Sequence, residues 1–269
     1  MELIDIGCNL THDSFDADRP AVIDHAIEAG VAQMVVTGAS AQGSEKALEL
    51  ARAWPGRLFA TAGVHPHRAS DYDAETDALL RELAGHKHVV AAGETGLDYF
   101  RDFSPRTDQQ NAFEAQLQIG ADTGLPLFLH LRDAHGDFHA ILKSRRDELS
   151  DVVVHCFTGE RKELHAYLDL DCHIGITGWI CDDRRGTHMQ EFMRDIPTDR
   201  LMLETDSPYL KPRNLRPRVK THRNEPRWLP WILGTLAACR NEHPEDLART
   251  TTATARRFFR LADSTADRN

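Results

Sequence analysis

Eight short apolar runs alternate with longer amphipathic stretches along almost the whole chain. The runs predict strands at 2–6, 31–37, 58–64, 89–94, 126–131, 152–156, 173–177 and 201–205. The stretches between them predict helices over 18–29, 43–53, 73–86, 107–123, 135–146, 160–169 and 187–194, and two more helices, over 226–239 and 244–260, close the chain. Eight strand–helix steps in a chain of 269 residues fit a (β/α)8 TIM barrel.

Alternation of strands and helices does not by itself show that a sheet closes, so a doubly wound open sheet is the alternative architecture. The sequence has neither a GxGxxG nor a GxxxxGK[ST] phosphate loop, which disfavours the nucleotide-binding versions of that fold. No long linker or low-complexity segment divides the chain. We therefore expect a single barrel domain over residues 1–269.

The composition is that of a soluble globular protein, with 28% charged residues and apolar runs that are only strand-sized. The N-terminus lacks the basic start and apolar core of a signal peptide. The five cysteines form no CxxC pair, and an odd number cannot close completely into disulfides. These features predict a cytoplasmic protein that does not contact membranes, and we expect a monomer.

The formal net charge of −10 argues against a protein that coats nucleic acid without specificity. One segment, 211–227, nevertheless holds seven cationic side chains against the single acid Glu225. The cations are Lys211, Arg213, Arg216, Arg218, Lys220, Arg223 and Arg227. A local basic segment of this kind is compatible with binding a phosphate backbone.

Five of the predicted strands end at or beside a residue that can bind a metal or transfer a proton. These residues are His65, Glu94, His130, His155 and Asp206. A parallel sheet gathers the carboxyl ends of its strands at one face, and neighbouring strands lie about 4.8 Å apart. Two histidines and two carboxylates at such positions predict a hydrolytic metal site.

Each of these residues also has an ordinary structural interpretation. Glu94 could pair with a backbone amide in a turn, His130 could be a hydrogen-bonded core residue, and Asp206 could cap a helix or turn. His65 lies in a rigid Gly-Val-His-Pro-His turn, which is compatible with a phosphate or metal contact and equally with a structural loop. The repetition of the pattern on several strands favours the metal site, at which Asp206 could orient or deprotonate a water.

The segments around these residues resemble the TatD family of metal-dependent nucleases, which belongs to the amidohydrolase-like barrels. The resemblance is carried, in order, by residues 5–11, 63–67, 93–98, 130–134, 155–159 and 204–210. Residues 176–186 and 223–226 are similar to the TatD branch of that family in particular. The resemblance extends from about residue 3 to residue 260.

This resemblance implies a divalent ion at Glu94, His130 and His155, with Asp206 completing the site or acting as the base. It implies Mg²⁺ as the usual ion, with Mn²⁺ or Zn²⁺ as alternatives. The implied activity is 3′–5′ exonuclease action on single-stranded DNA or RNA, with a part in clearing oxidatively damaged DNA. The alternatives are an ester or amide hydrolase, such as an aminoacyl-tRNA deacylase, and a non-catalytic nucleic-acid-binding protein.

The first strand departs from the family pattern. Many relatives carry His-x-His there, whereas this chain has Gly7 and Asn9. Because glycine offers no ligand and asparagine one weak oxygen, we expect one firmly bound ion, with a second held only loosely or with substrate.

Basic side chains could supply the charge that the second ion would otherwise provide. We expect Lys211, Arg213, Arg218 and Arg223 to bind phosphate, since they follow Asp206 and a guanidinium fork matches phosphate oxygens. His65 is a further candidate substrate contact. Four aromatic residues that follow strand ends could stack a terminal base, although packing is the other interpretation of each. They are Tyr99, Phe100, Phe103 and Trp179.

Overall fold

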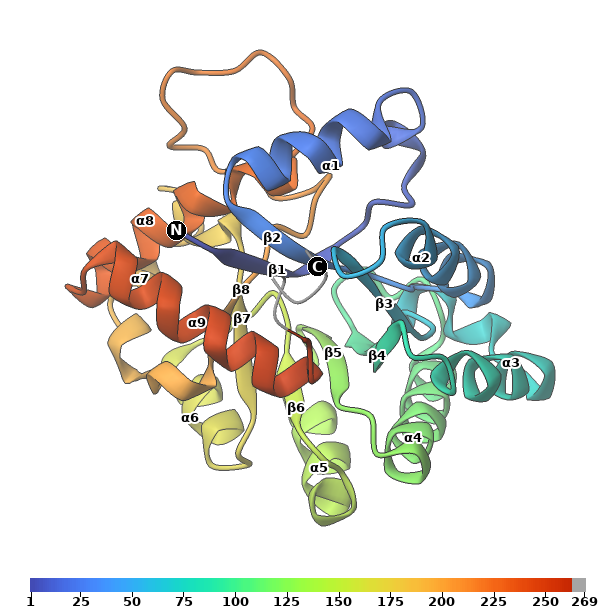
Figure 1. Ribbon diagram of the computed structural model, residues 1–269. Helices are drawn as coiled ribbons and strands as arrows, with labels where there is room; N and C mark the ends of the chain where they lie inside the picture. The colour runs from blue at the N-terminus through green and yellow to red at the C-terminus, as the bar shows by residue number, and fades with distance from the viewer. Residues whose placement is uncertain (263–269) are drawn as a thin grey trace. The chain divides into compact units, whose positions relative to one another are not determined.

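The computed structural model describes residues 1–262 (Figure 1), whose eight strands follow one another in a single sheet in sequence order. They are β1 Leu3–Cys8, β2 Val31–Val36, β3 Leu58–Ala62, β4 Val89–Asp98, β5 Leu127–Arg132, β6 Val152–Val154, β7 His173–Ile176 and β8 Leu201–Leu203. A doubly wound sheet reverses its strand order, so the sequential order excludes that alternative. The predicted (β/α)8 barrel is confirmed.

Helices α1 to α7 alternate with the strands, as the sequence predicts, and α8 and α9 follow β8. They are α1 Arg19–Glu28, α2 Ala41–Ala53, α3 Ala74–Ala84, α4 Arg106–Thr123, α5 His135–Arg145, α6 Arg161–Leu168, α7 Thr187–Gln190, α8 Leu229–Arg240 and α9 Pro244–Phe259. Side-chain caps fix two of the starts, since Ser40 accepts from Gly43 N and Asp73 from Thr76 N. The helix predicted over 187–194 is shorter, because Phe192 leaves helical geometry (φ −124°, ψ 9°).

The chain clusters into two compact units. The first unit contains Met1–Val36, Cys156–Arg161 and the residues from Ile174 onward, and the second contains Thr37–His155 and Lys162–His173. The expected single domain over 1–269 therefore stays a prediction.

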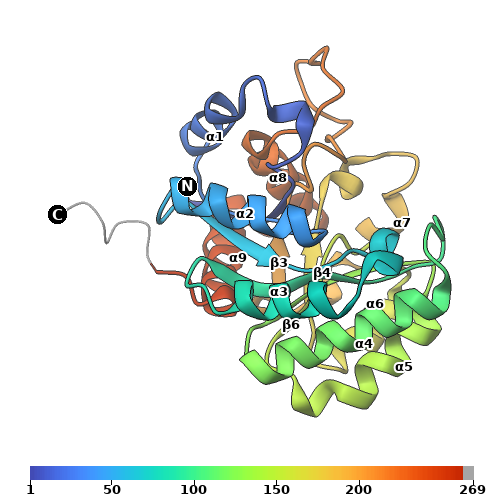
Figure 2. The same cartoon turned by 90° about the vertical axis from the view of Figure 1, so that its right-hand side faces the viewer.

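In the second unit, strands β3 to β6 pair in parallel and helices cover them. Helix α2 packs on β3 and α4 on β4, while α2, α3 and α4 pack against one another in succession (Figure 2). Phe113 of α4 and Phe138 of α5 are fully buried and stack with ring centroids 5.1 Å apart. This packed layer fixes β4 and β5, the strands that carry Glu94 and His130.

In the first unit, β1 pairs with β2, β7 pairs with β8, and β1 contacts β8. Helix α9 packs against β1, β8 and α8, burying Phe258 and Phe259. Its polar side tethers the N-terminus, because Thr252 donates to the Glu2 carbonyl at 3.0 Å and Arg256 pairs with the Glu2 carboxylate.

No helix within residues 1–262 combines the length and the apolar character needed to cross a bilayer. The five cysteines are free thiols.

Candidate metal centre

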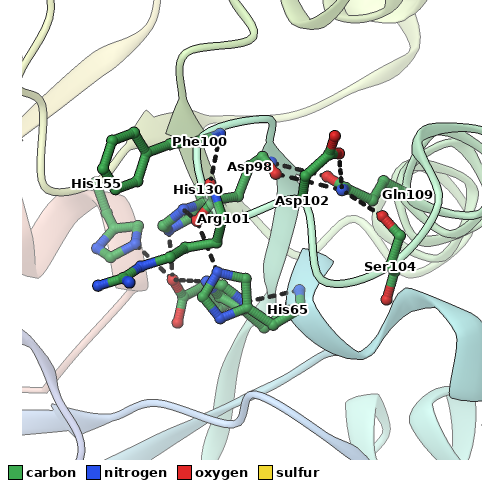
Figure 3. Close-up of polar contacts among 11 residues, drawn as sticks. His65, Asp98, Phe100, Arg101, Asp102, Ser104, Gln109, His130 and His155 are labelled. Atoms are coloured by element: carbon green, nitrogen blue, oxygen red, sulfur yellow. Dashed lines mark hydrogen bonds and ion pairs between the residues drawn. The ribbon is translucent and has the colours of Figure 1, made fainter.

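One carboxylate oxygen, Oε1 of Glu94, lies at the centre of a histidine cluster in the second unit. His155 Nε2 lies 2.7 Å from it, His130 Nδ1 3.0 Å and His65 Nε2 3.4 Å. Glu94 is only 6% exposed, so these imidazoles replace water as its partners. Figure 3 shows the His65, His130 and His155 rings, which come from three different segments of the chain, gathered close together.

An irregularity in β4 aims the Glu94 side chain. Gly93 pairs with Phe128 and Thr95 with Leu129, so Glu94 is the extra residue of a β-bulge, a device that redirects side chains at the rims of barrels. The flanking Gly93 and Gly96 have φ of +131° and +146°. A Cβ at Gly96 would lie 1.9 Å from the His130 carbonyl oxygen, so only glycine lets β4 approach β5 this closely.

The neighbouring strands supply the other two ligand candidates. His130 belongs to β5, and His155 directly follows β6, where its backbone N–H donates to the Leu129 carbonyl at 2.9 Å. The His155 ring stacks on the buried Phe128 ring at a centroid distance of 4.5 Å. The structure thus brings Glu94, His130 and His155 together.

His65 also lies in the cluster, and one of its two ring nitrogens is already hydrogen-bonded. It follows β3 at the start of the 3-10 turn Pro66–Asp71, where its Nδ1 accepts from the His67 backbone N–H at 3.1 Å. A neutral imidazole whose Nδ1 accepts carries its proton on Nε2. In this arrangement His65 Nε2 faces the Glu94 carboxylate, whose Oε1 lies 3.4 Å away.

A second carboxylate, Asp98, supports the cluster, and strand-end reasoning missed it. Its Oδ2 accepts from His67 Nε2 at 2.7 Å and lies 3.5 Å from His130 Nε2. The predicted strand stopped at Glu94, whereas β4 continues to Asp98. Glu94 and Asp98 are four residues apart on β4, so they project from the same face of the strand. This spacing is the sequence feature from which Asp98 could have been predicted.

The burial of this cluster shifts its pKa values. Burial opposes ionisation of Glu94, but the charges of His155 and His65 and the histidine hydrogen bonds outweigh it and hold the Glu94 pKa well below its ordinary value. Burial lowers the pKa of His65 well below its ordinary value, although the Glu94 charge opposes this shift. For His130, burial is outweighed by the Asp98 and Glu94 carboxylates, which raise its pKa.

The residues present fit a metal ion. Ligand atoms of His65, Glu94 and His130 all lie within 4.8 Å of one another. Within residues 1–262, the buried Nε2 of His130 makes no hydrogen bond, and its nearest charged group is the Asp98 carboxylate at 3.5 Å. An ionised carboxylate with two or three imidazoles is a donor set used for divalent transition metals, and its oxygens also suit Mg²⁺ and Mn²⁺.

Asp206 follows β8 in the first unit, where the first strand holds it. Its backbone N–H donates to the Gly7 carbonyl at 2.8 Å, and Asn9 Nδ2 donates to its Oδ1 at 2.9 Å. Asn9, which we considered as a weak oxygen ligand, is thus bound to the Asp206 carboxylate through its amide nitrogen.

Asp5 is fully buried beneath this segment in the same unit. Its carboxylate accepts from Thr205 N at 2.9 Å, from Thr205 Oγ1 at 2.5 Å and from Gly7 N at 3.2 Å. Burial raises the Asp5 pKa to about 8, although the Thr205 and Gly7 hydrogen bonds oppose the shift.

Three of the four expected phosphate contacts line one pocket of about 410 Å³ in the first unit. Lys211, Arg213 and Arg218 line it together with Arg185 and His222. The buried Asp182 orients two of these cations, since its Oδ2 lies 2.8 Å from Arg185 Nε and 3.1 Å from Arg213 Nε. The pocket combines converging positive charge with room for an anion.

The fourth, Arg223, has different surroundings. Its guanidinium forms a bidentate pair with Asp18 at 2.7 and 2.8 Å, lies 3.0 Å from Glu225 and stacks on Phe15. These contacts occupy much of its hydrogen-bonding capacity.

Comparison with known proteins places the whole chain in one family. Residues 4–260 match the model of TatD-related DNases. A protein named 3′-5′ ssDNA/RNA exonuclease TatD from Erwinia billingiae is 49% identical over 96% of this chain and 99% of its own length. Its namesake from Pantoea vagans is 48% identical over 97% of this chain and 100% of its own.

Solved structures agree. The crystal structure of YJJV, a TatD homologue from Escherichia coli K12, superposes with a TM-score of 0.88 at 26% identity, covering 97% of this chain and 98% of that one. A TatD-family hydrolase from Entamoeba histolytica gives a TM-score of 0.86 at 25% identity, covering 97% and 99%. This chain therefore belongs to the family of TatD-related DNases.

Proposed function

We propose that the protein is a metal-dependent 3′–5′ exonuclease that hydrolyses phosphodiester bonds of single-stranded DNA, with RNA as a second substrate. The observation that carries this proposal is the convergence of His130, His155 and His65 on the buried Glu94 carboxylate. The relatives that are about half identical over nearly their whole length are named as exonucleases of this kind, which supports the choice of substrate.

The ion would be held by Glu94, His130 and His155, and we propose Mg²⁺, with Mn²⁺ or Zn²⁺ as the alternatives. A bound divalent ion supplies Lewis-acid charge to a phosphoryl oxygen and lowers the pKa of a bound water. One firmly bound ion is expected, because Gly7 offers no side-chain ligand and the Asn9 amide already donates to Asp206.

The protein's own groups prepare this reaction. Low exposure of Glu94 and His155 excludes bulk water and strengthens their electrostatic interactions. His65 Nε2 lies 3.4 Å from Glu94 Oε1, while Asp98 accepts from His67 and lies beside His130. Asp206 is our proposed base, a role supported by its place at a strand end and by the Asn9 amide that orients its carboxylate.

The cationic pocket would bind a phosphate of the strand through Lys211, Arg213 and Arg218. Two observations support this proposal: these cations line one pocket, and the Asp182 carboxylate pairs with two of the guanidinium groups there. Arg223 is retained as a substrate contact of smaller effect, since two carboxylates already neutralise it. We further propose that the protein acts in the cytoplasm as a monomer, in the repair of damaged DNA.

The decisive experiment is a divalent-metal titration of mononucleotide release from a 5′-labelled single strand, with wild type and His155→Ala. We expect progressive shortening from the 3′ end by wild type, and loss of activity in the variant that excess Mg²⁺ does not restore. Charged tRNA is assayed in parallel. Deacylation of the tRNA without release of mononucleotides from either DNA or RNA would refute the exonuclease in favour of an ester hydrolase.

A further inference from the structure

The loop between β4 and α4 exposes two large aromatic side chains. Phe100 is 53% exposed and Phe103 is 67% exposed. Scattered exposed apolar residues are normal on a protein surface, but two such rings within four residues of one short loop are a candidate contact for a ligand. We call residues 99–105 the aromatic loop.

Hydrogen bonds with Asp98 and Gln109 hold the backbone of the aromatic loop. Asp98 Oδ1 accepts from the backbone N–H groups of Phe100 at 3.0 Å and Arg101 at 2.8 Å. Gln109, which is 1% exposed, accepts from Asp98 N at 2.8 Å and donates to the Ser104 carbonyl at 2.9 Å. The dashed lines in Figure 3 trace these bonds. A loop fixed in this way loses little conformational entropy when a ligand binds.

The aromatic loop adjoins the metal centre through His67. The Phe103 ring contacts the His67 ring at a centroid distance of 4.8 Å and an interplanar angle of 65°. The His67 ring in turn lies 4.2 Å from the His65 ring. Asp98 belongs to both regions, since one oxygen holds the loop backbone and the other holds His67.

Cationic groups flank the Phe100 ring. The Arg132 guanidinium lies over the Phe100 ring at 4.1 Å and the Arg101 guanidinium at 5.5 Å. Alternating aromatic rings and guanidinium groups are the chemistry with which proteins bind single-stranded nucleic acid, because bases stack on the rings and phosphates pair with the cations.

We propose that the aromatic loop is the subsite for the unpaired terminal base, which stacks on Phe103, while Phe100 with Arg132 contacts the adjoining nucleotide. This proposal rests on the proposed function and deepens it by naming the part of the strand that the second unit recognises. Stacking on an aromatic platform is tolerant of sequence, so the subsite selects single-stranded ends of any base composition.

The test is a double-mutant cycle, in which a change at Phe103 is combined with removal of the 3′-terminal base. Wild type, Phe103→Ala, Phe103→Leu and Phe103→Trp are compared on two 5′-fluorescein strands that differ only at the 3′-terminal nucleotide, one with a thymine and one abasic. Dissociation constants come from fluorescence anisotropy in EDTA, and kcat/KM values come from assays with the activating metal. Because Phe103 is exposed, these variants are expected to fold, which thermal melting verifies.

We expect Phe103→Ala to weaken binding of the thymine-ended strand about tenfold and binding of the abasic strand by less than twofold. Phe103→Leu should lose nearly as much, because it keeps apolar bulk without an aromatic face, and Phe103→Trp should retain wild-type binding. Equal losses on both strands, or no loss on either, would overturn the proposal. If wild type hydrolyses no strand with any ion, the exonuclease proposal fails, whereas base-dependent binding in EDTA would still support the subsite.

Discussion

Glu94 in the second unit and Asp5 in the first are both buried carboxylates, but their partners differ in kind. Glu94 is surrounded by imidazoles that can accept or release a proton, and its pKa is well below normal. Asp5 is held by an amide and a hydroxyl of Thr205 and the Gly7 amide, and its pKa is raised to about 8. Burial alone therefore does not make a carboxylate a metal ligand. Of these two carboxylates, Glu94 is the one whose pKa favours the ionised form at neutral pH, and it is also the one with imidazole neighbours that could bind the same cation.

The largest effect is expected from Glu94→Gln. The neutral amide removes the charge at the centre of the cluster, so metal affinity should fall by more than about a hundredfold, beyond what is typical for an outer-shell partner. Isothermal titration with Mn²⁺ measures this. Asp5→Asn is the matched control, since it neutralises a carboxylate buried to a similar degree, and it should keep metal affinity within about threefold. Comparable losses in both variants would erase the distinction between the two carboxylates.

The second effect concerns the pH dependence of stability. Asp5 has an ordinary pKa of 3.8 and a folded-state pKa of about 8, so between these values the folded state holds a proton that the unfolded chain has released. The stability contributed by the protonated Asp5 is therefore lost as the pH rises from about 4 to about 8.

Asp5→Asn should abolish this pH dependence. The unfolding free energy of the variant minus that of wild type should therefore be larger at pH 8 than at pH 5. Urea unfolding at several pH values measures it. Parallel curves for the two proteins across this range would show that Asp5 is ionised in the folded state.

A smaller effect is expected from Asp98→Asn. The amide can still accept the Phe100 and Arg101 N–H bonds, but the negative charge beside His67 and His130 is lost. Metal affinity should fall about 10- to 100-fold, as for other outer-shell partners. Thermal melting without metal separates this loss from unfolding, and an unchanged metal affinity would remove Asp98 from the centre.

The smallest effects should come from the cations of the first unit. Arg213→Ala should weaken binding of a single strand severalfold and reduce the dependence of log K on log salt by about 0.7, the value for one phosphate contact on a single strand. Arg223→Ala is the matched control, because Asp18 and Glu225 neutralise Arg223. Arg223→Ala should lower the melting temperature measurably and change the affinity for a single strand little. The reverse pattern would make Arg223 the phosphate ligand.

Most of the fold and three residues of the centre could be predicted from sequence. Apolar runs ending in Glu94, His130 and His155 are local signals, and parallel strands bring such ends together. The residues that hydrogen-bond to the predicted site residues could not be predicted in the same way. Asp98 was missed because Gly96 resembles a turn residue, whereas the structure uses it for close approach to His130. The roles of His65 and Asn9 depend on hydrogen bonds to His67 N and Asp206, which only the folded chain defines.

The tether between Glu2 and helix α9 has a consequence for biosynthesis. Thr252 and Arg256 contact Glu2 across about 250 residues of chain, and β1 packs on the same helix. At ribosomal rates of about 5–20 residues per second, β1 leaves the exit tunnel tens of seconds before its partner helix exists. Glu94, His130 and His155 are all synthesised earlier and within one unit. The segment that carries the histidine cluster can thus assemble on the nascent chain before α9 is made, whereas the first unit can be completed only after α9 has emerged.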